Sequence, residues 1–318
     1  MPPSIEPCVA EGAAPSSLSF TRSASAEALE NRLKGRSNRD RGDESRLPID
    51  ACAASLTEAK PLVRIKDATL RLSLGQNRRA MPTEWEQEAE NWVRWARAPG
   101  HDAYWYFAPS FFNQIVPEPG RRTLEIGCGE GRAARDLALR GHRVTALDAS
   151  ATLIGHASQA DPEGRYVLGD AAALPFADGS FDIAVAYNSL MDVEDMPAAV
   201  AEAARVLQPG GRLCVSVTHP VNDAGAFRED DPDAPFVVEN SYLGKRRFEG
   251  TFERDGLRIT FRGWCYPMED YSRALESAGL LIDRIREPAA TEEAVASRPS
   301  YIQWQRVPMF LQIRAVKP

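Results

Sequence analysis

The pattern of apolar and polar positions predicts alternating strands and helices across the middle of the chain. Short apolar runs predict strands at Thr123–Ile126, Val144–Leu147 and Ile183–Tyr187. Residues 132 to 140 instead place alanines and leucine at helical spacing, and Gly141 is suited to cap that helix at its C-terminus. Strands that alternate with helices in this way are typical of an α/β sheet.

A glycine-rich loop joins the first predicted strand to its helix. The loop reads Gly127-Cys128-Gly129-Glu130-Gly131, so it has little side-chain bulk where a ligand would approach the backbone. Asp148 ends the second strand, and its carboxyl end is where open α/β sheets bind ligands. The loop and the acid together indicate a nucleotide-cofactor site.

The spacing of the glycines separates two classes of cofactor. A nicotinamide site would show G-x-G-x-x-G, but Arg132 stands where the third glycine would be. The glycines follow an acidic residue, Glu125, in an otherwise apolar strand. This E-x-G-x-G-x-G pattern with the strand-ending Asp148 resembles motif I of the class I S-adenosylmethionine-dependent methyltransferases. A nicotinamide-dependent oxidoreductase is the less favoured alternative.

Further blocks extend the resemblance over residues 122 to 220, in the order found in that family. Asp195 and Pro197 are suited to begin a helix that ends at Leu207-Gln208-Pro209-Gly210-Gly211, before a strand at Leu213–Thr218. The other blocks are Gly169-Asp170-Ala171, Leu174-Pro175-Phe176 and Ser180-Phe181-Asp182. The resemblance implies a Rossmann-like, doubly wound sheet of seven strands, mostly parallel with an antiparallel last strand.

The segment from about 219 to 265 is predicted to be an inserted β cap over the substrate end. Strand-like runs occur at Phe236–Tyr242 and Phe248–Phe252, and Asp255-Gly256 predicts a tight hairpin turn into Leu257–Phe261. A helix is predicted near Pro267. After it we expect a strand at Leu280–Ile285, an irregular stretch to about Trp304 and a last strand at Met309–Val316.

The first 80 residues differ in composition from the rest. All six Trp and all eight Tyr follow residue 80, and Phe20 is the one aromatic residue before it. Such a stretch has too few apolar residues for a core, so we expect residues 1–80 to be a disordered extension and residues 81–318 to be the methyltransferase domain. Met81 fits a natural start. A transit peptide is disfavoured by ten acidic residues in this stretch.

Charge, cysteine content and the lengths of the apolar runs limit the classes of substrate, metal site and cellular location that the sequence favours. Residues 81–318 hold 25 basic and 35 acidic residues, a net charge of −10, which disfavours a nucleic-acid substrate. Five scattered cysteines without C-x-x-C spacing argue against a disulfide framework or a zinc site and suit a reducing cytoplasm. No apolar run is long enough for a signal peptide or a membrane span.

The resemblance assigns cofactor contacts residue by residue. The glycine loop would lie against the methionine and ribose portions of S-adenosylmethionine, with Glu125 bracing the loop or reaching the amino group through water. Asp148 would accept hydrogen bonds from both ribose hydroxyls. The full set of implied cofactor residues is Glu125, Gly127, Cys128, Gly129, Asp148, Ala149, Asp170, Ala171 and Asn188. For Asp170 and Asn188 a plain turn role is the alternative.

The acceptor and the catalytic group are read from the residues around the cap. His219 directly follows a strand at the ligand edge, and its unperturbed pKa suits a general base near neutrality; the alternative is a histidine that fixes the cap. Tyr104 is a candidate substrate or cofactor contact. Other candidate substrate residues are Met191, Asp192, Asn222, Tyr242, Trp264 and Tyr266. We expect methyl transfer to an oxygen or nitrogen of a small molecule; a tRNA or protein acceptor, or a non-catalytic S-adenosylmethionine-binding module, are the alternatives.

Overall fold

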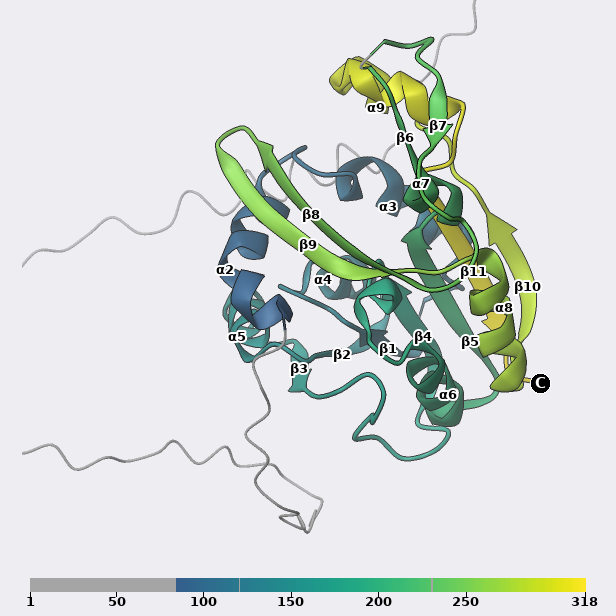
Figure 1. Cartoon of the computed structure of the whole chain (residues 1–318). Helices are drawn as coiled ribbons and strands as arrows, with labels where there is room; N and C mark the ends of the chain where they lie inside the picture. Colours follow the sequence, from purple (N-terminus) through teal and green to yellow (C-terminus); the bar gives the residue numbers. More distant parts are fainter. Residues whose placement is uncertain (1–83, 120, 230) are drawn as a thin grey trace, which may run out of the picture. The chain divides into compact units, whose positions relative to one another are not determined.

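Seven strands form one sheet in the order β10-β11-β5-β4-β1-β2-β3 (Figure 1). The structure is a computed structural model that describes residues 84–119, 121–229 and 231–318. The predicted extension over residues 1–80 therefore lies outside the described residues. The strands of the sheet are β1 (Arg122–Ile126), β2 (Arg143–Asp148), β3 (Arg165–Leu168), β4 (Phe181–Tyr187), β5 (Leu207–Thr218), β10 (Leu281–Arg286) and β11 (Phe310–Val316).

The strand directions confirm the predicted architecture. Strand β1 pairs in parallel with both β2 and β4, and β4 pairs in parallel with β5. Strand β11 lies antiparallel between β5 and β10. Because the chain moves outward from β1 in opposite directions, the carboxyl ends of β1 and β4 form the switch point at which doubly wound sheets bind ligands.

Helices cover both faces of the sheet and bury its apolar side chains. On one face, α6 (Met196–Val206) and α8 (Met268–Ser277) belong to the largest apolar cluster, with Val215, Val217 and Ile313 of the sheet. On the other face, α3 (Tyr104–Gln114) and α4 (Arg132–Leu139) pack over Ile183 and Val185. Asp195 caps α6 as predicted, since its side chain accepts a hydrogen bond from the Ala198 amide at 3.0 Å.

The inserted segment contains the predicted long hairpin. Strands β8 (Arg246–Arg254) and β9 (Leu257–Cys265) are antiparallel, and both turn residues have positive φ, 51° at Asp255 and 74° at Gly256. Two such residues match the right-handed twist of a hairpin. In Figure 1 the hairpin crosses above the sheet, and its Phe261 packs edge-to-face with Trp85 and Trp92 of α2 (Glu84–Arg97), at 6.1 Å for each pair. The predicted β cap is therefore present.

Three stretches differ from the sequence prediction. Strand β5 begins at Leu207, six residues before the predicted start at Leu213. The strand expected at Phe236–Tyr242 is only β7 (Phe236–Val238), paired with β6 (Gly225–Phe227), because the amides of Glu239 and Asn240 both turn to the Ala224 carbonyl that ends α7 (Pro220–Ala224). The stretch expected to be irregular contains α9 (Glu292–Ser297) and η2 (Pro299–Gln305). Thr291 begins α9 by accepting a hydrogen bond from the Ala294 amide.

Helix α5 (Ala151–Ala160) packs beside α2, where Ala89 and Val93 of α2 form an apolar cluster with Leu153 of α5. Trp95 of α2 is buried, at 5% exposure, and packs edge-on against His101. Across the described part of the chain, none of the helices combines the length and the apolar character that crossing a membrane requires.

Candidate functional site

The glycine loop between β1 and α4 is a backbone cradle at the switch point. Gly127, Gly129 and Gly131 all have positive φ, of 73°, 55° and 85°. A Cβ on Gly127 would lie 2.4 Å from Cβ of Ser189, and one on Gly129 would lie 2.9 Å from the indole nitrogen of Trp92. The loop is held by the Leu147 carbonyl, which accepts hydrogen bonds from the amides of Gly127 and Cys128. Conformation and space therefore both require glycine here.

Asp148 lies beside this loop at the end of β2, as the sequence predicts. Its carboxylate accepts hydrogen bonds from the amides of Gly129 at 2.8 Å and Ser150 at 2.9 Å, one on each oxygen. Burial raises the pKa of Asp148, and the surrounding amides partly offset that effect. Each carboxylate oxygen keeps a second lone pair, so the group can still accept hydrogen bonds from two hydroxyls of a ribose.

Glu125 is the buried acid beneath the loop. It is 2% exposed, and its Oε2 atom has no hydrogen-bond partner among the described residues. Burial raises the pKa of Glu125 well above its usual value, and the negative charge of Asp148 raises it further. An unpaired buried carboxyl group beside a second acid favours a cationic ligand, which would lower both pKa values.

The end of β4 approaches the loop from the other side. Asn188 has a positive φ of 51°, its amide donates to the Ser216 carbonyl at 2.7 Å, and its Oδ1 accepts from the Ser216 hydroxyl at 2.7 Å. The next residue, Ser189, donates its hydroxyl to the Ile126 carbonyl. Side-chain hydrogen bonds thus fix the turn at Asn188, and a contact of Asn188 with the cofactor remains a prediction.

The predicted adenine contacts lie after β2 and β3 at the same edge. Ala149 is exposed and Ala171 is buried. Asp170 is exposed and accepts a hydrogen bond from the Ala172 amide at 2.8 Å, which is the turn role considered as its alternative. This bond uses one lone pair of one oxygen, so the predicted adenine contact of Asp170 is compatible with the geometry.

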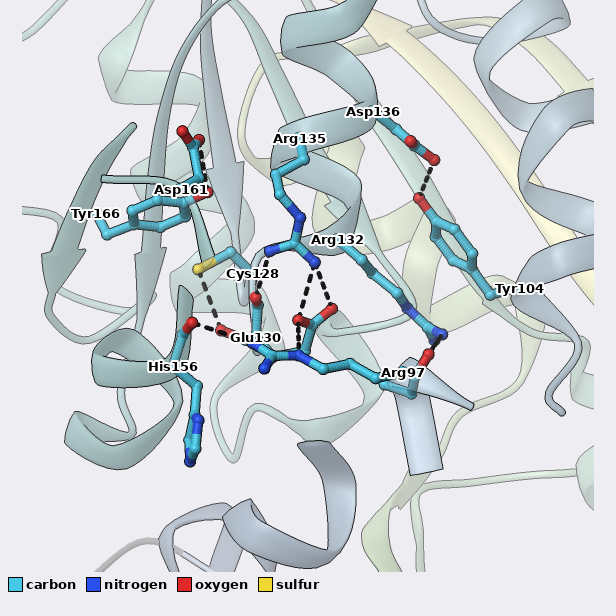
Figure 2. Close-up of polar contacts among 12 residues, drawn as sticks. Arg97, Tyr104, Cys128, Glu130, Arg132, Arg135, Asp136, His156, Asp161 and Tyr166 are labelled. Carbon is cyan, nitrogen blue, oxygen red and sulfur yellow. Dashed lines mark hydrogen bonds and ion pairs between the residues drawn. The ribbon is translucent and has the colours of Figure 1, made fainter. Parts of the chain in front are cut away.

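A cluster of charges around Glu130, which the sequence reasoning missed, fastens the loop to its surroundings. Figure 2 shows Arg97 of α2 and Arg135 of α4 meeting at the Glu130 carboxylate, each at 2.9 Å from Oε2. Glu130 is 1% exposed, and Arg97 also donates to the His156 carbonyl of α5. The signal in the sequence was a charged residue, Glu130, inside a glycine loop. Arg135 follows it five residues later, and Arg97 lies on a neighbouring helix.

Tyr104 and Arg132 form a second contact between the N-terminal helices and α4. The guanidinium of Arg132 stacks on the Tyr104 ring and pairs with Asp102 at 2.7 Å. The Tyr104 hydroxyl donates a hydrogen bond to Asp136 at 2.7 Å (Figure 2). Burial is the main cause that raises the pKa of Tyr104. Ring and hydroxyl are therefore both engaged within the protein, which supports a packing role for Tyr104 rather than the predicted substrate contact.

His219 follows β5 at the predicted position but has both ring nitrogens engaged. Its Nδ1 accepts a hydrogen bond from the Val221 amide at 3.1 Å and so caps α7, and its Nε2 lies 2.8 Å from Glu287. The side chain is 4% exposed. With Nδ1 accepting, Nε2 carries the proton and no lone pair is left for a substrate. The geometry does not support the predicted base and agrees with the alternative, a histidine that fixes the cap.

Four of the candidate substrate residues lie in η1 (Leu190–Asp192) or at the end of β9, namely Met191, Asp192, Trp264 and Tyr266. Lys245 lies 3.8 Å above the Trp264 ring, and the Tyr242 hydroxyl accepts a hydrogen bond from the Met268 amide at 3.4 Å. Met191 packs against the main apolar cluster. A Cβ on Gly263 would lie 2.7 Å from Oδ1 of Asp192, so η1 and β9 meet closely.

The residues present suit S-adenosylmethionine as a ligand. The glycine cradle leaves no room for a Cβ, Asp148 offers acceptors for two hydroxyls, and the unpaired Glu125 favours a positive ligand such as one with sulfonium and ammonium groups. Among the described residues, no group of three or more His, Cys, Asp or Glu is arranged to hold a metal ion.

Comparison with known proteins gives the same identification. Residues 124–215 match a family model described as a methyltransferase domain. A demethylmenaquinone methyltransferase of Beutenbergia cavernae is 37% identical over 117 residues, covering 37% of this chain and 48% of that protein. A malonyl-[acyl-carrier protein] O-methyltransferase of Serratia marcescens is 39% identical over 98 residues, covering 31% and 38%. The chain thus spans half or less of the length of these relatives.

A solved structure extends the similarity beyond the matched segment. The S-adenosylmethionine-dependent methyltransferase of Mesorhizobium loti is 26% identical, with a TM-score of 0.54 over 68% of this chain and 98% of that one. The family model, the relatives and the strand order agree with the motif around Gly127 and Asp148. Residues 124–215 thus form a methyltransferase domain of the class I S-adenosylmethionine-dependent type, and S-adenosylmethionine is the cofactor of this domain.

Proposed function

We propose that the protein transfers a methyl group from S-adenosylmethionine to an oxygen or nitrogen of a small molecule. The observation that carries the proposal is the pairing of the Gly127–Gly131 cradle with Asp148 at the switch point of the sheet. This arrangement offers backbone to one part of the cofactor and two hydrogen-bond acceptors to its ribose. S-adenosylmethionine supplies, when bound, an activated methyl group on sulfur.

The protein's own residues would act mainly by positioning. Gly127 and Gly129 have no side chain that would keep the cofactor from the backbone. Asp148 would bind the ribose hydroxyls, and the unpaired carboxyl group of Glu125 would stabilise the positive charge of the cofactor. Ala149, Asp170, Ala171, Cys128 and Asn188 are proposed to complete the cofactor site. Holding two reactants in attack geometry supplies about 7–11 kcal/mol, so a strong nucleophile needs little further help.

A small acceptor is supported by charge and by the cap. Residues 81–318 carry a net charge of −10, from 25 basic and 35 acidic residues, which opposes binding along a phosphate backbone. The β8–β9 hairpin crosses above the carboxyl ends of the strands and contacts α2, so the edge is covered rather than open (Figure 1). One relative is named for a small molecule, demethylmenaquinone.

Two measurements test the proposal. Calorimetry should show binding of S-adenosylmethionine and none of NAD. Incubation with methyl-labelled donor and a cell metabolite extract should give a labelled small molecule. Label confined to tRNA or protein would contradict the small acceptor, and binding of the donor without any transfer would instead show a non-catalytic module.

A further inference from the structure

Several polar side chains without hydrogen-bond partners lie together at the base of the cap. Among the described residues, the buried atoms without a partner include Arg246 Nε and the hydroxyls of Tyr266 and Tyr271. The two tyrosines are 4% and 3% exposed, and their rings pack edge-to-face with centroids 5.6 Å apart. Leaving a buried polar group unpaired costs about 1–3 kcal/mol, so this cluster is poised to bind a polar ligand.

Asp223 of α7 belongs to the same cluster. Arg246 donates a hydrogen bond from Nη2 to the Asp223 main-chain oxygen, which brings the guanidinium beside this residue. In the part of the chain that the structure describes, however, the Asp223 carboxylate forms neither a hydrogen bond nor an ion pair. A carboxylate and an N–H of opposite charge therefore lie close together, and each lacks a direct partner.

The charged and titratable groups around Asp223 come from four elements. Burial raises the pKa of Asp223 to about 7, and Arg246 opposes that rise. Burial also raises the pKa of Cys265 to about 11 and that of Tyr271 well above its usual value, and the charge of Asp223 adds to both shifts. The groups near Asp223 are His219, whose main-chain carbonyl accepts a hydrogen bond from the Asp223 amide, Arg246 of β8, Cys265 of β9 and Tyr271 of α8.

The cluster borders the cofactor edge of the sheet. Helix α7 directly follows β5, whose carboxyl end lies beside that of β4. Asp192 bridges the two regions, since its charge acts on the pKa of Tyr271 and its own pKa is raised by burial and then by Asp148. The unpaired groups thus lie on the side of the cofactor acid where an acceptor would enter.

We propose that Asp223 takes the proton from the substrate group that receives the methyl group. This group is an acidic hydroxyl of the phenol or enol class, and Arg246 and Tyr271 hold its oxygen. This inference rests on the proposed methyl transfer. The hydroxyl O–H bond breaks, its proton moves to the Asp223 carboxylate, and its electron pair stays on the oxygen. The oxygen then takes the methyl group as the donor sulfur keeps the pair of the broken C–S bond, and Asp223 later releases its proton to water.

The unpaired donor selects a hydroxyl over an amine. The Nε of Arg246 is a donor only, on a group that stays cationic, so it attracts a developing oxyanion and repels an ammonium group. The tyrosine hydroxyls donate equally well to an oxyanion. A carboxylate that titrates near neutrality is suited to accept the proton from a weakly acidic hydroxyl.

The test compares Asp223→Asn and Asp223→Glu with Asp233→Asn, an exposed control in the neighbouring loop. Each protein is given methyl-labelled S-adenosylmethionine and the metabolite extract from pH 5 to 9. We expect Asp223→Asn to lower the rate at pH 7 by about 10²–10⁴-fold, the usual contribution of a general base, and to flatten the rise in rate near neutrality. Asp223→Glu should restore part of the rate, donor affinity by calorimetry should be unchanged, and the product should be a methyl ether.

Difference infrared spectroscopy gives a readout that needs no acceptor. A carboxyl band that titrates near pH 7 in the wild type should be missing in Asp223→Asn. Absence of that band from the wild type, an N-methylated product, or a wild-type rate in Asp223→Asn at every pH would each overturn the inference. If the wild type binds the donor and methylates nothing in the extract, the proposed function itself fails.

Discussion

The guanidinium carbon of Arg132 lies 4.1 Å from the centroid of the Tyr104 ring. The same guanidinium donates to the Ala96 carbonyl at 3.2 Å and pairs with Asp102 at 2.7 Å. One residue at the start of α4 thus joins α2, the loop after it and α3 to the end of the glycine loop. The arginine that distinguishes this sequence from a nicotinamide fingerprint also fastens the N-terminal helices beside the cofactor site.

Replacing Arg132 by Ala should destabilise the fold by about 2–5 kcal/mol. The change leaves the largely buried Asp102 charge without its partner and removes the cation–π contact with Tyr104. Urea unfolding measures the effect, with Arg94→Ala, an exposed arginine of α2, as the control within about 0.5 kcal/mol of wild type. Equal stability of the two variants would show that the Arg132 contacts contribute little.

The free energy of unfolding of Arg132→Lys should lie between those of wild type and Arg132→Ala. Lysine keeps the charge near Asp102 but lacks the planar fork that lets arginine stack on Tyr104 and reach the Ala96 carbonyl together. A stability equal to that of Arg132→Ala would assign the whole effect to stacking and geometry. A stability equal to wild type would assign it to charge alone.

Glu125→Gln should change how stability depends on pH. The folded-state pKa of Glu125 is raised by burial, so the folded protein holds this proton at pH values where the unfolded chain releases it. Its stabilising contribution is therefore complete below the unfolded pKa, near 4.5, and is lost as pH rises toward the folded pKa. Glutamine carries no charge to bury, so the variant should gain stability over wild type from pH 5 to pH 8, by at most about 1.4 kcal/mol per pH unit.

Urea unfolding at pH 5, 6.5 and 8 measures the difference between the two proteins. Glu118→Gln, which changes an exposed glutamate, is the matched control and should follow wild type at each pH. A constant difference between Glu125→Gln and wild type would contradict the prediction, because only a proton bound differently in the two states makes the difference vary with pH.

The sequence predicted the part of this molecule where local pattern and geometry coincide. The Gly127 loop and the Asp255-Gly256 turn need backbone conformations that few other residues adopt, so they can be predicted before the fold is known. Asp148 can be predicted from its position at the end of a strand. The Glu130 cluster could not be predicted in this way. Arg97 lies 33 residues before Glu130 and Arg135 five residues after it, on two different helices. Contacts between distant segments depend on packing, which a single sequence does not show.

The same reason explains the outcome at His219 and Tyr104. The position of His219 after β5 was predicted, whereas its engagement by Val221 and Glu287 depends on α7 and on the segment after β10. The hydroxyl of Tyr104 is taken by Asp136, on a helix the chain reaches 32 residues later. Asp223 was not among the predicted site residues, because its neighbours come from β8, β9 and α8, which are distant from it in the sequence.

His219→Asn should keep most of the activity, and His219→Ala should lose stability. The asparagine side chain can accept the hydrogen bond from the Val221 amide and so replace the cap of α7, whereas alanine cannot. The alanine variant should be about 0.5–2 kcal/mol less stable, with donor affinity retained. Rates below a hundredth of wild type in both variants, at equal stability, would instead show that His219 acts as the predicted base.

Asp148→Asn should weaken binding of S-adenosylmethionine without unfolding the protein. The amide keeps one oxygen, enough to hold either Gly129 or Ser150, but it cannot accept on both sides and loses the charge that strengthens hydrogen bonds to ribose hydroxyls. Loss of one charge-assisted bond is worth about 1.5–3 kcal/mol, or about a 10–150-fold rise in Kd by calorimetry. Asp170→Asn is the matched control at the same edge, and because that side chain is exposed its own effect should be smaller. An unchanged Kd in Asp148→Asn would remove the ribose role from Asp148 and with it the main support for the cofactor's placement.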